Sequence, residues 1–194
     1  MRYMRMLRKF GLSVLIASLL SVTTAWAQGN APWTSVGSAG TVDESSLFLA
    51  NLGSPLAGAV TMGGPGTVTI RYNVVAVAGL LRAANDTPMT ILTARLLDHG
   101  AGEQVVVSLK QYNLYDPGAV TTLLTLDSDI FPASNLFQTH VVTYCGSFDF
   151  ENNGYFVEVQ LHKAFNRFPG TIFPANYPRP ALGVIKISQD SCLN

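Results

Sequence analysis

The stretch TVTIRYNV, residues 67–74, decides the fold of this chain, because polar and apolar side chains alternate along it without interruption. On an extended strand Val68, Ile70, Tyr72 and Val74 fall on one side, and the polar residues fall on the other. One buried face and one wetter face are typical of an antiparallel sheet. The stretch therefore predicts a β-strand with one face in a core.

The same pattern recurs along the rest of the chain, where short runs of β-branched and aromatic residues are separated by turn residues. The predicted strands are Thr67–Val77, Thr90–Leu97, Glu103–Tyr112, Ala119–Leu126, Phe137–Tyr144, Tyr155–His162 and Ala181–Ser188. No segment has a convincing helical period. We predict an all-β fold, an antiparallel β-sandwich of the jelly-roll or immunoglobulin-like kind, with seven to nine strands and little helix.

The segment before Thr67 is less regular. Gln28–Gly40 is rich in Gly, Ser and Ala and is predicted to be loosely held. Asp43–Leu52 fits either a short strand or a helical turn. Ser54–Gly66 combines several glycines with two prolines, a composition that predicts a loop.

The dipeptide Asn153-Gly154 predicts a β-hairpin, because both residues tolerate positive φ. A two-residue loop would place Asp149 opposite Glu158, which is unfavourable for like charges. A four-residue loop, Glu151–Gly154, places Asp149 opposite Phe156 instead. We therefore expect the longer loop.

The N-terminus has the three parts of an export signal. Basic residues precede an apolar run of 13 residues, Phe10–Val22, and Ala25-Trp26-Ala27 follows. A membrane-spanning helix needs about 20 apolar residues, so this run is too short. We predict a signal peptide over residues 1–27, removal after Ala27, one β-sandwich domain over residues 28–194, and a periplasmic or extracellular location with no membrane span.

Charge and cysteine content follow from this prediction. Four of the 12 basic residues lie in residues 1–27 and all 12 acidic residues lie beyond, so the remainder has a net charge of −4. That charge argues against a nucleic-acid partner. In an oxidising compartment Cys145 and Cys192 are predicted to form a disulfide, with intermolecular pairing or two free thiols as the alternatives.

No catalytic motif stands out. The three histidines, His99, His140 and His162, are scattered, and the chain has no G-x-S-x-G turn. The four glutamates lie in no recognisable glycosidase setting. We predict no cofactor and favour a non-enzymatic protein.

A weak alternative for a metal is calcium. Asp149, Glu151 and Asn153 place oxygen atoms at alternate positions before a glycine, which resembles the first half of a calcium-binding loop. The competing interpretation is an Asn-Gly type turn with acidic neighbours.

Lys163–Pro180 is a long segment without the alternation of the predicted strands on either side of it. It contains four prolines, four aromatic residues, three basic residues and no acidic residue. Long loops in compact domains are often functional. It is either a flap that closes the core or a binding loop. If it binds, the expected ligand contacts are Phe168, Phe173, Tyr177 and Arg179.

The function itself stays open at this point. The first hypothesis is a secreted, non-enzymatic binding or interaction domain for an extracellular glycan or protein. The alternatives are a secreted hydrolase with a hidden carboxylate site and a structural subunit of an extracellular assembly.

Overall fold

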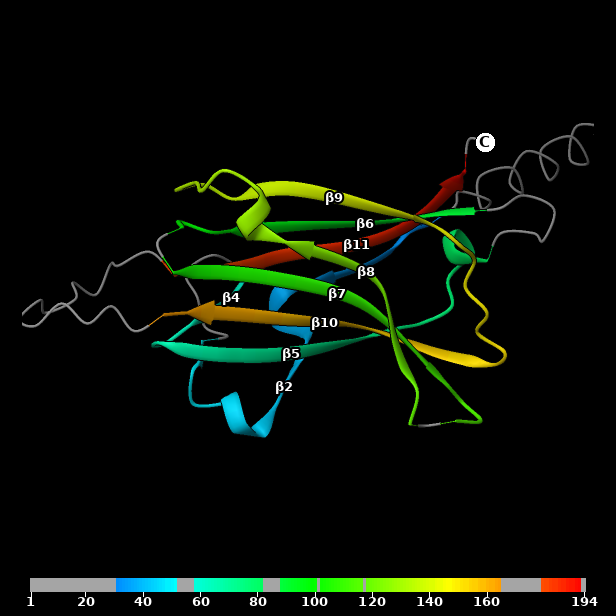
Figure 1. Ribbon diagram of the computed structural model, residues 1–194, viewed down its shortest axis with the longest axis horizontal. Coiled ribbons are helices and arrows are strands. Elements are labelled where there is room, and N and C mark those ends of the chain that lie inside the picture. The colour runs from blue at the N-terminus through cyan, green and yellow to red at the C-terminus, as the bar shows by residue number, and fades with distance from the viewer. Residues whose placement is uncertain are drawn as a thin grey trace, which may run out of the picture. The chain divides into compact units, whose positions relative to one another are not determined.

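Two antiparallel sheets face one another in the computed structural model, which describes residues 31–51, 58–81, 88–100, 102–116, 118–164 and 179–192 (Figure 1). The described residues belong to one compact unit. The strands of the first sheet are β1 (Trp33–Val36), β3 (Ala50–Asn51), β4 (Val60–Met62), β6 (Pro88–Leu97), β9 (Gln138–Cys145) and β11 (Ala181–Ser191). The strands of the second sheet are β2 (Thr41–Val42), β5 (Gly66–Val74), β7 (Glu103–Asn113), β8 (Val120–Asp127) and β10 (Asn153–Lys163).

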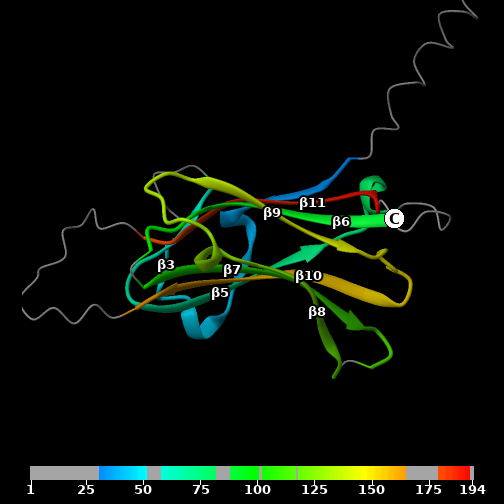
Figure 2. The same cartoon turned by 45° about the horizontal axis from the view of Figure 1, so that its top comes forward.

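The order of the strands is β3-β4-β11-β6-β9 in the first sheet, with β1 also beside β11, and β2-β5-β10-β7-β8 in the second. Figure 2 shows the two sheets as separate layers. The 3-10 segments are η1 (Gly37–Ala39), η2 (Glu44–Ser46), η3 (Ala78–Leu80) and η4 (Ser128–Ile130). The antiparallel β-sandwich is therefore confirmed. The described residues form eleven strands rather than seven to nine, because four short strands precede β5.

The core lies between the sheets and follows the predicted alternation. Val68, Ile70 and Tyr72 of β5 are buried, as are Val157 and Val159 of the neighbouring β10. Burying a side chain of this size contributes about 1.5–3 kcal/mol. Each long strand therefore has one face fixed in the core, and its opposite face is left for solvent or a ligand.

The segment before β5 is more ordered than its composition indicates. Trp33 is buried and pairs with Ile187 of β11, so Gln28–Gly40 is not loosely held over its described part. Val60–Met62, inside the predicted loop Ser54–Gly66, is a fully buried strand on β11. The glycines and prolines around Val60–Met62 indicate a loop, so the sequence did not predict this short strand. Asp43–Leu52 contains both predicted alternatives, the helical turn η2 and the strand β3.

The hairpin predicted at Asn153-Gly154 is wrong. β9 lies in the first sheet beside β6, whereas β10 lies in the second sheet between β5 and β7. Residues 146–152 therefore cross from one sheet to the other, and Phe156 lies opposite Asn73 and Lys110 rather than Asp149. The crossing is anchored by Phe148 and Phe150, whose rings pack edge-on against a buried tyrosine at 4.7 and 5.0 Å. Packing of these aromatic rings outweighs the local turn preference.

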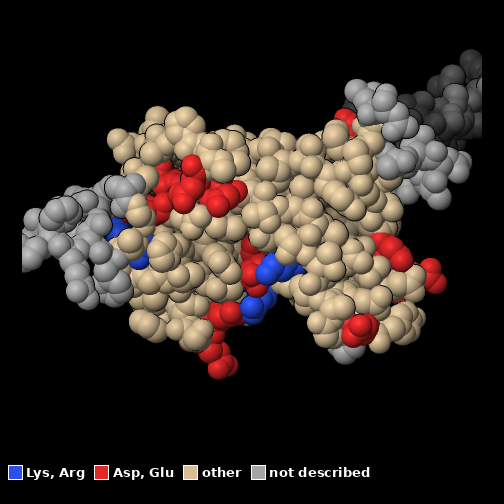
Figure 3. Space-filling view, in the orientation of Figure 1, with Lys and Arg blue, Asp and Glu red and all other residues tan. Residues whose placement is uncertain are grey.

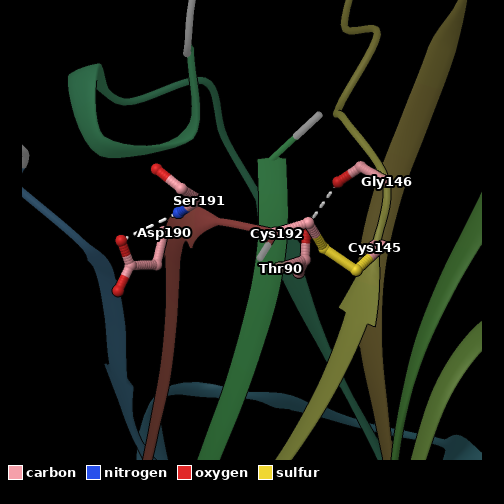
Figure 4. Close-up of a disulfide and its surroundings, with 6 residues drawn as sticks. All are labelled: Thr90, Cys145, Gly146, Asp190, Ser191 and Cys192. Carbon is pink, nitrogen blue, oxygen red and sulfur yellow. Dashed lines mark hydrogen bonds between the residues drawn. A yellow bond between two sulfur atoms is a disulfide. The ribbon is translucent and has the colours of Figure 1, made fainter. Parts of the chain in front are cut away.

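The predicted disulfide is confirmed. Cys145 ends β9, Cys192 follows β11, and their Cα atoms are 6.0 Å apart. Because β6 lies between these two strands, the bridge crosses the end of β6, where Ser191 lies opposite Pro88 (Figure 4). In the chain-entropy model, a bridge over this sequence separation of 47 stabilises the fold by about 4 kcal/mol.

No helix in the described part of the chain is long and apolar enough to cross a membrane.

Candidate functional site

The outer face of the second sheet brings together polar side chains from strands that are far apart in the sequence. Arg71 of β5 lies opposite Glu158 of β10, and Glu158 lies opposite Ser108 of β7. Lys110 lies two residues beyond Ser108 on β7, opposite Phe156. Alternation directs all of these side chains away from the core.

These three charged residues and Asp43, which follows β2, form a continuous chain of ion pairs, which we call the ionic cluster: Asp43, Arg71, Glu158 and Lys110. Arg71 Nη1 lies 2.5 Å from Asp43 Oδ1, and Arg71 Nη2 lies 3.1 Å from Glu158 Oε2. Lys110 Nζ lies 2.6 Å from Glu158 Oε1. Glu158 is therefore the central residue of the cluster, because it alone bonds both cations.

Glu158 is the most enclosed member of the cluster, with 10% of its side chain exposed. Burial by itself would raise the pKa of its carboxyl group. The hydrogen bonds and charges of Lys110 and Arg71 together outweigh burial and hold the pKa of Glu158 below its usual range. Glu158 is thus ionised at neutral and mildly acidic pH and acts as a hydrogen-bond acceptor.

An aromatic pair lies beside the ionic cluster on the same face. The ring centroids of Tyr112 and Phe156 are 6.3 Å apart, with an angle of 46° between the planes. Tyr112 is 38% exposed, and its ring covers Gly154, its cross-strand neighbour. A Cβ atom at position 154 would lie 2.0 Å from Cζ of that ring. The glycine therefore allows the ring to lie flat against the sheet.

The face around the cluster is hollowed. Figure 3 shows basic and acidic side chains gathered in a recess between two projecting lobes. In the same orientation Figure 1 places η2 in one lobe and the connection between β7 and β8 in the other. Each lobe carries an exposed aromatic ring, since Phe48 beyond η2 and Tyr115 beyond β7 are both 81% exposed. The recess thus has charged side chains at its floor.

A polar pocket of about 400 Å³ adjoins this face at the edge of the sandwich. β2 begins at Thr41, opposite Arg71, while the antiparallel β5 continues past that point to Val74. Because β2 begins there, the edge of β5 beyond Arg71 has no partner from β2. The lining residues are Trp33, Thr34, Ser35, Ala39, Thr41, Arg71, Tyr72 and Asn73. Arg71 and Asn73 therefore belong both to the pocket and to the sheet face.

The residues predicted for ligand binding lie elsewhere in the chain. Phe168, Phe173 and Tyr177 lie outside the described residues. Arg179 is described, and its Nη1 donates to the backbone oxygen of the buried Met62 at 3.1 Å. At least part of its hydrogen-bonding capacity thus supports the fold.

Lys163, the first residue of the Lys163–Pro180 loop, also contacts the folded domain. Lys163 Nζ donates to Glu103 Oε1 at 3.0 Å, and His99 Nδ1 lies 3.1 Å from Glu103 Oε2. Glu103 is buried, so these contacts satisfy a carboxylate inside the protein.

The residues of the calcium alternative lie in the crossing between the sheets. Oδ1 of Asp149 accepts hydrogen bonds from the backbone N–H groups of Glu151 and Asn152, at 3.1 and 3.2 Å. The backbone oxygen of Asp149 accepts from the N–H of Asn153 at 3.0 Å. The side-chain hydrogen bond from Asn152 is the main cause that lowers the pKa of Asp149. These bonds make an Asx turn, and calcium binding there stays a prediction.

The three histidines have separate surroundings. His162 Nδ1 lies 3.0 Å from Thr67 Oγ1 on the outer face of the second sheet. His140 of β9 stacks on Phe131, which follows η4, with ring centroids 3.8 Å apart. Neither contact, nor that of His99, places a histidine beside a serine or cysteine nucleophile.

The aromatic pair and the ionic cluster were not predicted as a site. The sequence pattern assigns Arg71, Lys110 and Glu158 to wetter strand faces, but it does not say which strands are neighbours. Arg71 and Glu158 are 87 positions apart in sequence. The polar alternation on three strands is the only sequence signal for this face.

Comparisons with known proteins give no family. No protein-family model matches the chain, and no curated protein matches it. Among solved structures the chain is similar to the C-terminal CBM6 module of LamC, a marine laminarinase from Zobellia galactanivorans. The two are 10% identical with a TM-score of 0.44, over 81% of this chain and 99% of that one.

Two further solved structures are similar at the same level. A GH26-CBM35 β-(1,4)-mannanase from Podospora anserina is 14% identical with a TM-score of 0.42, over 86% of this chain and 29% of that one. The Stig cyclase Fisc from Fischerella sp. TAU is 10% identical with a TM-score of 0.40, over 86% and 92%. Likenesses of this strength carry no information on ligand or activity, so function has to be argued from the chain's own residues.

Proposed function

We propose that this protein is an exported, non-enzymatic domain that binds glycans on the outer face of its second sheet. The observation that carries the proposal is the aromatic pair Tyr112–Phe156 beside the ionic cluster in a recess of that face.

The chemistry of a sugar suits this arrangement. One face of a sugar ring carries C–H groups with a slight positive charge, which are attracted to the negative face of an aromatic ring. The rim of the sugar carries hydroxyl groups, which need both donors and acceptors. Arg71 and Lys110 supply N–H donors, and Asp43, the more exposed carboxylate of the cluster, supplies charged acceptors. Side chains held in ion pairs are already ordered, so less entropy is lost on binding.

Export is supported by two independent features. The N-terminus has the three parts of a signal peptide, and Cys145–Cys192 is a disulfide of the kind that persists in oxidising compartments. Mass spectrometry of the protein from the periplasm or medium tests this directly. We expect a mature chain that begins at Gln28; an intact chain from Met1 recovered from the cytosol would contradict export.

A hydrolase is the less favoured alternative. A carboxylic acid that donates a proton in glycoside hydrolysis needs a raised pKa. The pKa of Glu158, the most enclosed carboxylate on this face, is lowered by its two cations. This carboxylate therefore suits binding better than general-acid catalysis.

The Lys163–Pro180 loop remains a second proposed contact region, through Phe168, Phe173 and Tyr177. Its proline content limits the freedom of the unfolded chain, and its aromatic residues would add contact area. This part of the proposal rests on sequence alone.

The test begins with a glycan panel. Wild-type protein is screened against immobilised polysaccharides, and the best ligand is then titrated against Tyr112→Ala and Phe156→Ala. Each substitution is expected to weaken binding by about 1–3 kcal/mol with little change in melting temperature. Tyr144→Ala, an exposed tyrosine on β9 of the other sheet, is the matched control and should bind as wild type does. Equal loss in all three variants would contradict the proposed site.

A further inference from the structure

We infer that this face selects uncharged glycans over anionic ones, and that Glu158 is the residue that sets the preference. The inference rests on the proposed function and adds the chemical class of the ligand.

Charge balance within the ionic cluster is the first step. The cluster holds two cations, Arg71 and Lys110, and two carboxylates, Asp43 and Glu158. Each cation bonds a carboxylate at 3.1 Å or less. The cluster has no net charge, so its cations exert little attraction on an anion at a distance.

The surroundings of the cluster are acidic. η2 contributes Glu44, the connection between β7 and β8 contributes Asp116, and β8 ends at Asp127. The negative charge of these neighbouring elements disfavours a carboxylate or sulfate group on this side of the sheet. Because Arg71 and Lys110 are already paired with Asp43 and Glu158, an anion bound at either cation would also lie close to a carboxylate and be repelled by it.

A neutral sugar faces no such competition. A guanidinium has five N–H donors and an ammonium has three, so Arg71 and Lys110 keep donors beyond their ion pairs. The oxygens of Glu158 are filled by Arg71, Lys110 and Gln160, whereas the more exposed Asp43 keeps acceptor positions for hydroxyl groups. Hydroxyl groups can thus bond to the cluster while Arg71, Glu158 and Lys110 stay paired. The face as built is complementary to a ligand with many hydroxyl groups and no charge.

Glu158 holds this balance because it contacts both cations and is the more enclosed of the two carboxylates, with 10% of its side chain exposed against 32% for Asp43. Replacing Glu158 with Gln keeps the shape of the side chain and removes its charge. Two cations would then face one carboxylate, and the cluster would carry one net positive charge. The variant should accept anionic glycans that wild type rejects.

The experiment compares two sets of polysaccharides in affinity electrophoresis or biolayer interferometry. The neutral set is a β-glucan, a galactomannan and a neutral arabinoxylan, and the anionic set is alginate, polygalacturonate and heparin. Wild type is expected to bind at least one neutral polymer and none of the anionic ones. Glu158→Gln is expected to gain about tenfold or more in affinity for at least one anionic polymer at about 0.05 M salt, and to lose the gain at about 0.5 M salt.

Asp190→Asn is the matched control. It changes the net charge by the same amount, but Asp190 lies near the end of β11 in the other sheet. It should show no gain for anionic polymers. Asp43→Asn provides a second route if Glu158→Gln does not fold, because Asp43 is more exposed and its loss also leaves one net positive charge.

The outcomes separate the two claims. If wild type binds anionic polymers as tightly as neutral ones, or if Glu158→Gln and Asp190→Asn gain equally, the inference is overturned while glycan binding stands. If wild type binds no polymer of either set, the proposed function fails and the inference fails with it.

Discussion

The ring of Tyr112 lies over the backbone of Gly154, its cross-strand neighbour, at a separation that leaves no room for a Cβ atom. This contact ties the position of an exposed aromatic ring to one glycine. It offers a way to move the ring without removing it.

Gly154→Ala is therefore expected to displace the Tyr112 ring from the sheet. The new methyl group would meet the far end of a side chain that can rotate, so the cost in stability should be about 1 kcal/mol or less. Binding of a glycan should fall severalfold, because the aromatic pair loses its arrangement. Calorimetric titration and thermal melting check the two effects. A large loss of stability with unchanged affinity would contradict this role of the contact.

Replacing Glu158 should change stability in a pH-dependent way. The folded-state pKa of Glu158 is lowered, so its ion pairs stabilise the fold fully above the usual pKa of a glutamate, about 4.3, and stop doing so as pH falls through the folded pKa. Glu158→Gln should thus cost about 1–2 kcal/mol at neutral pH. The difference from wild type should shrink as pH falls below about 4.3 and through the lowered folded-state pKa.

Urea unfolding at a series of pH values measures this difference. Comparison with the variant cancels the titration of other carboxylates that the two proteins share. A difference in unfolding free energy that is constant with pH would show that the ion pairs of Glu158 do not stabilise the fold.

The Cys145–Cys192 bridge should be a major source of stability. The double variant Cys145→Ser, Cys192→Ser is expected to lose about 4 kcal/mol by the chain-entropy model. Wild type in the presence of a reductant should melt at a similar temperature to the variant, and the variant should not respond to the reductant. A wild-type melting temperature that is insensitive to full reduction, confirmed by thiol counting, would argue against this contribution.

Arg179 is expected to matter for stability more than for binding. Arg179→Ala removes the donor to Met62 O, a buried backbone oxygen, and should cost about 1–2 kcal/mol. Tyr177→Ala is the cleaner test of the loop as a binding region, since a change at Arg179 mixes both effects. A loss of affinity in Tyr177→Ala with an unchanged melting temperature would support the loop; unchanged affinity would remove it from the proposal.

The sequence predicts the long strands well, because alternation is a local signal. In β5, β7 and β10 the apolar residues that the alternation places on the core side are buried. Glu103 and Glu158 are buried as well, which the pattern did not predict, because ion pairs with residues distant in the sequence cover them. It also predicts the partner of Cys145, since the chain has one other cysteine.

Features that depend on distant contacts could not be predicted in the same way. The Asn153-Gly154 turn signal is genuine, but Phe148 and Phe150 pack into the core and take the chain across to the other sheet. β4 is buried because β11 lies beside it, a pairing across more than a hundred residues. The recess on the second sheet likewise exists only once β10 lies between β5 and β7.

The most direct test of the central claim is an amide chemical-shift titration of ¹⁵N-labelled protein with a soluble oligosaccharide of the best neutral polymer. Binding to the outer face of the second sheet predicts the largest shifts at Asn73, Gly154, Phe156 and Glu158. Shifts confined to the outer face of the first sheet, at Thr93, Val141 and Lys186, would contradict it.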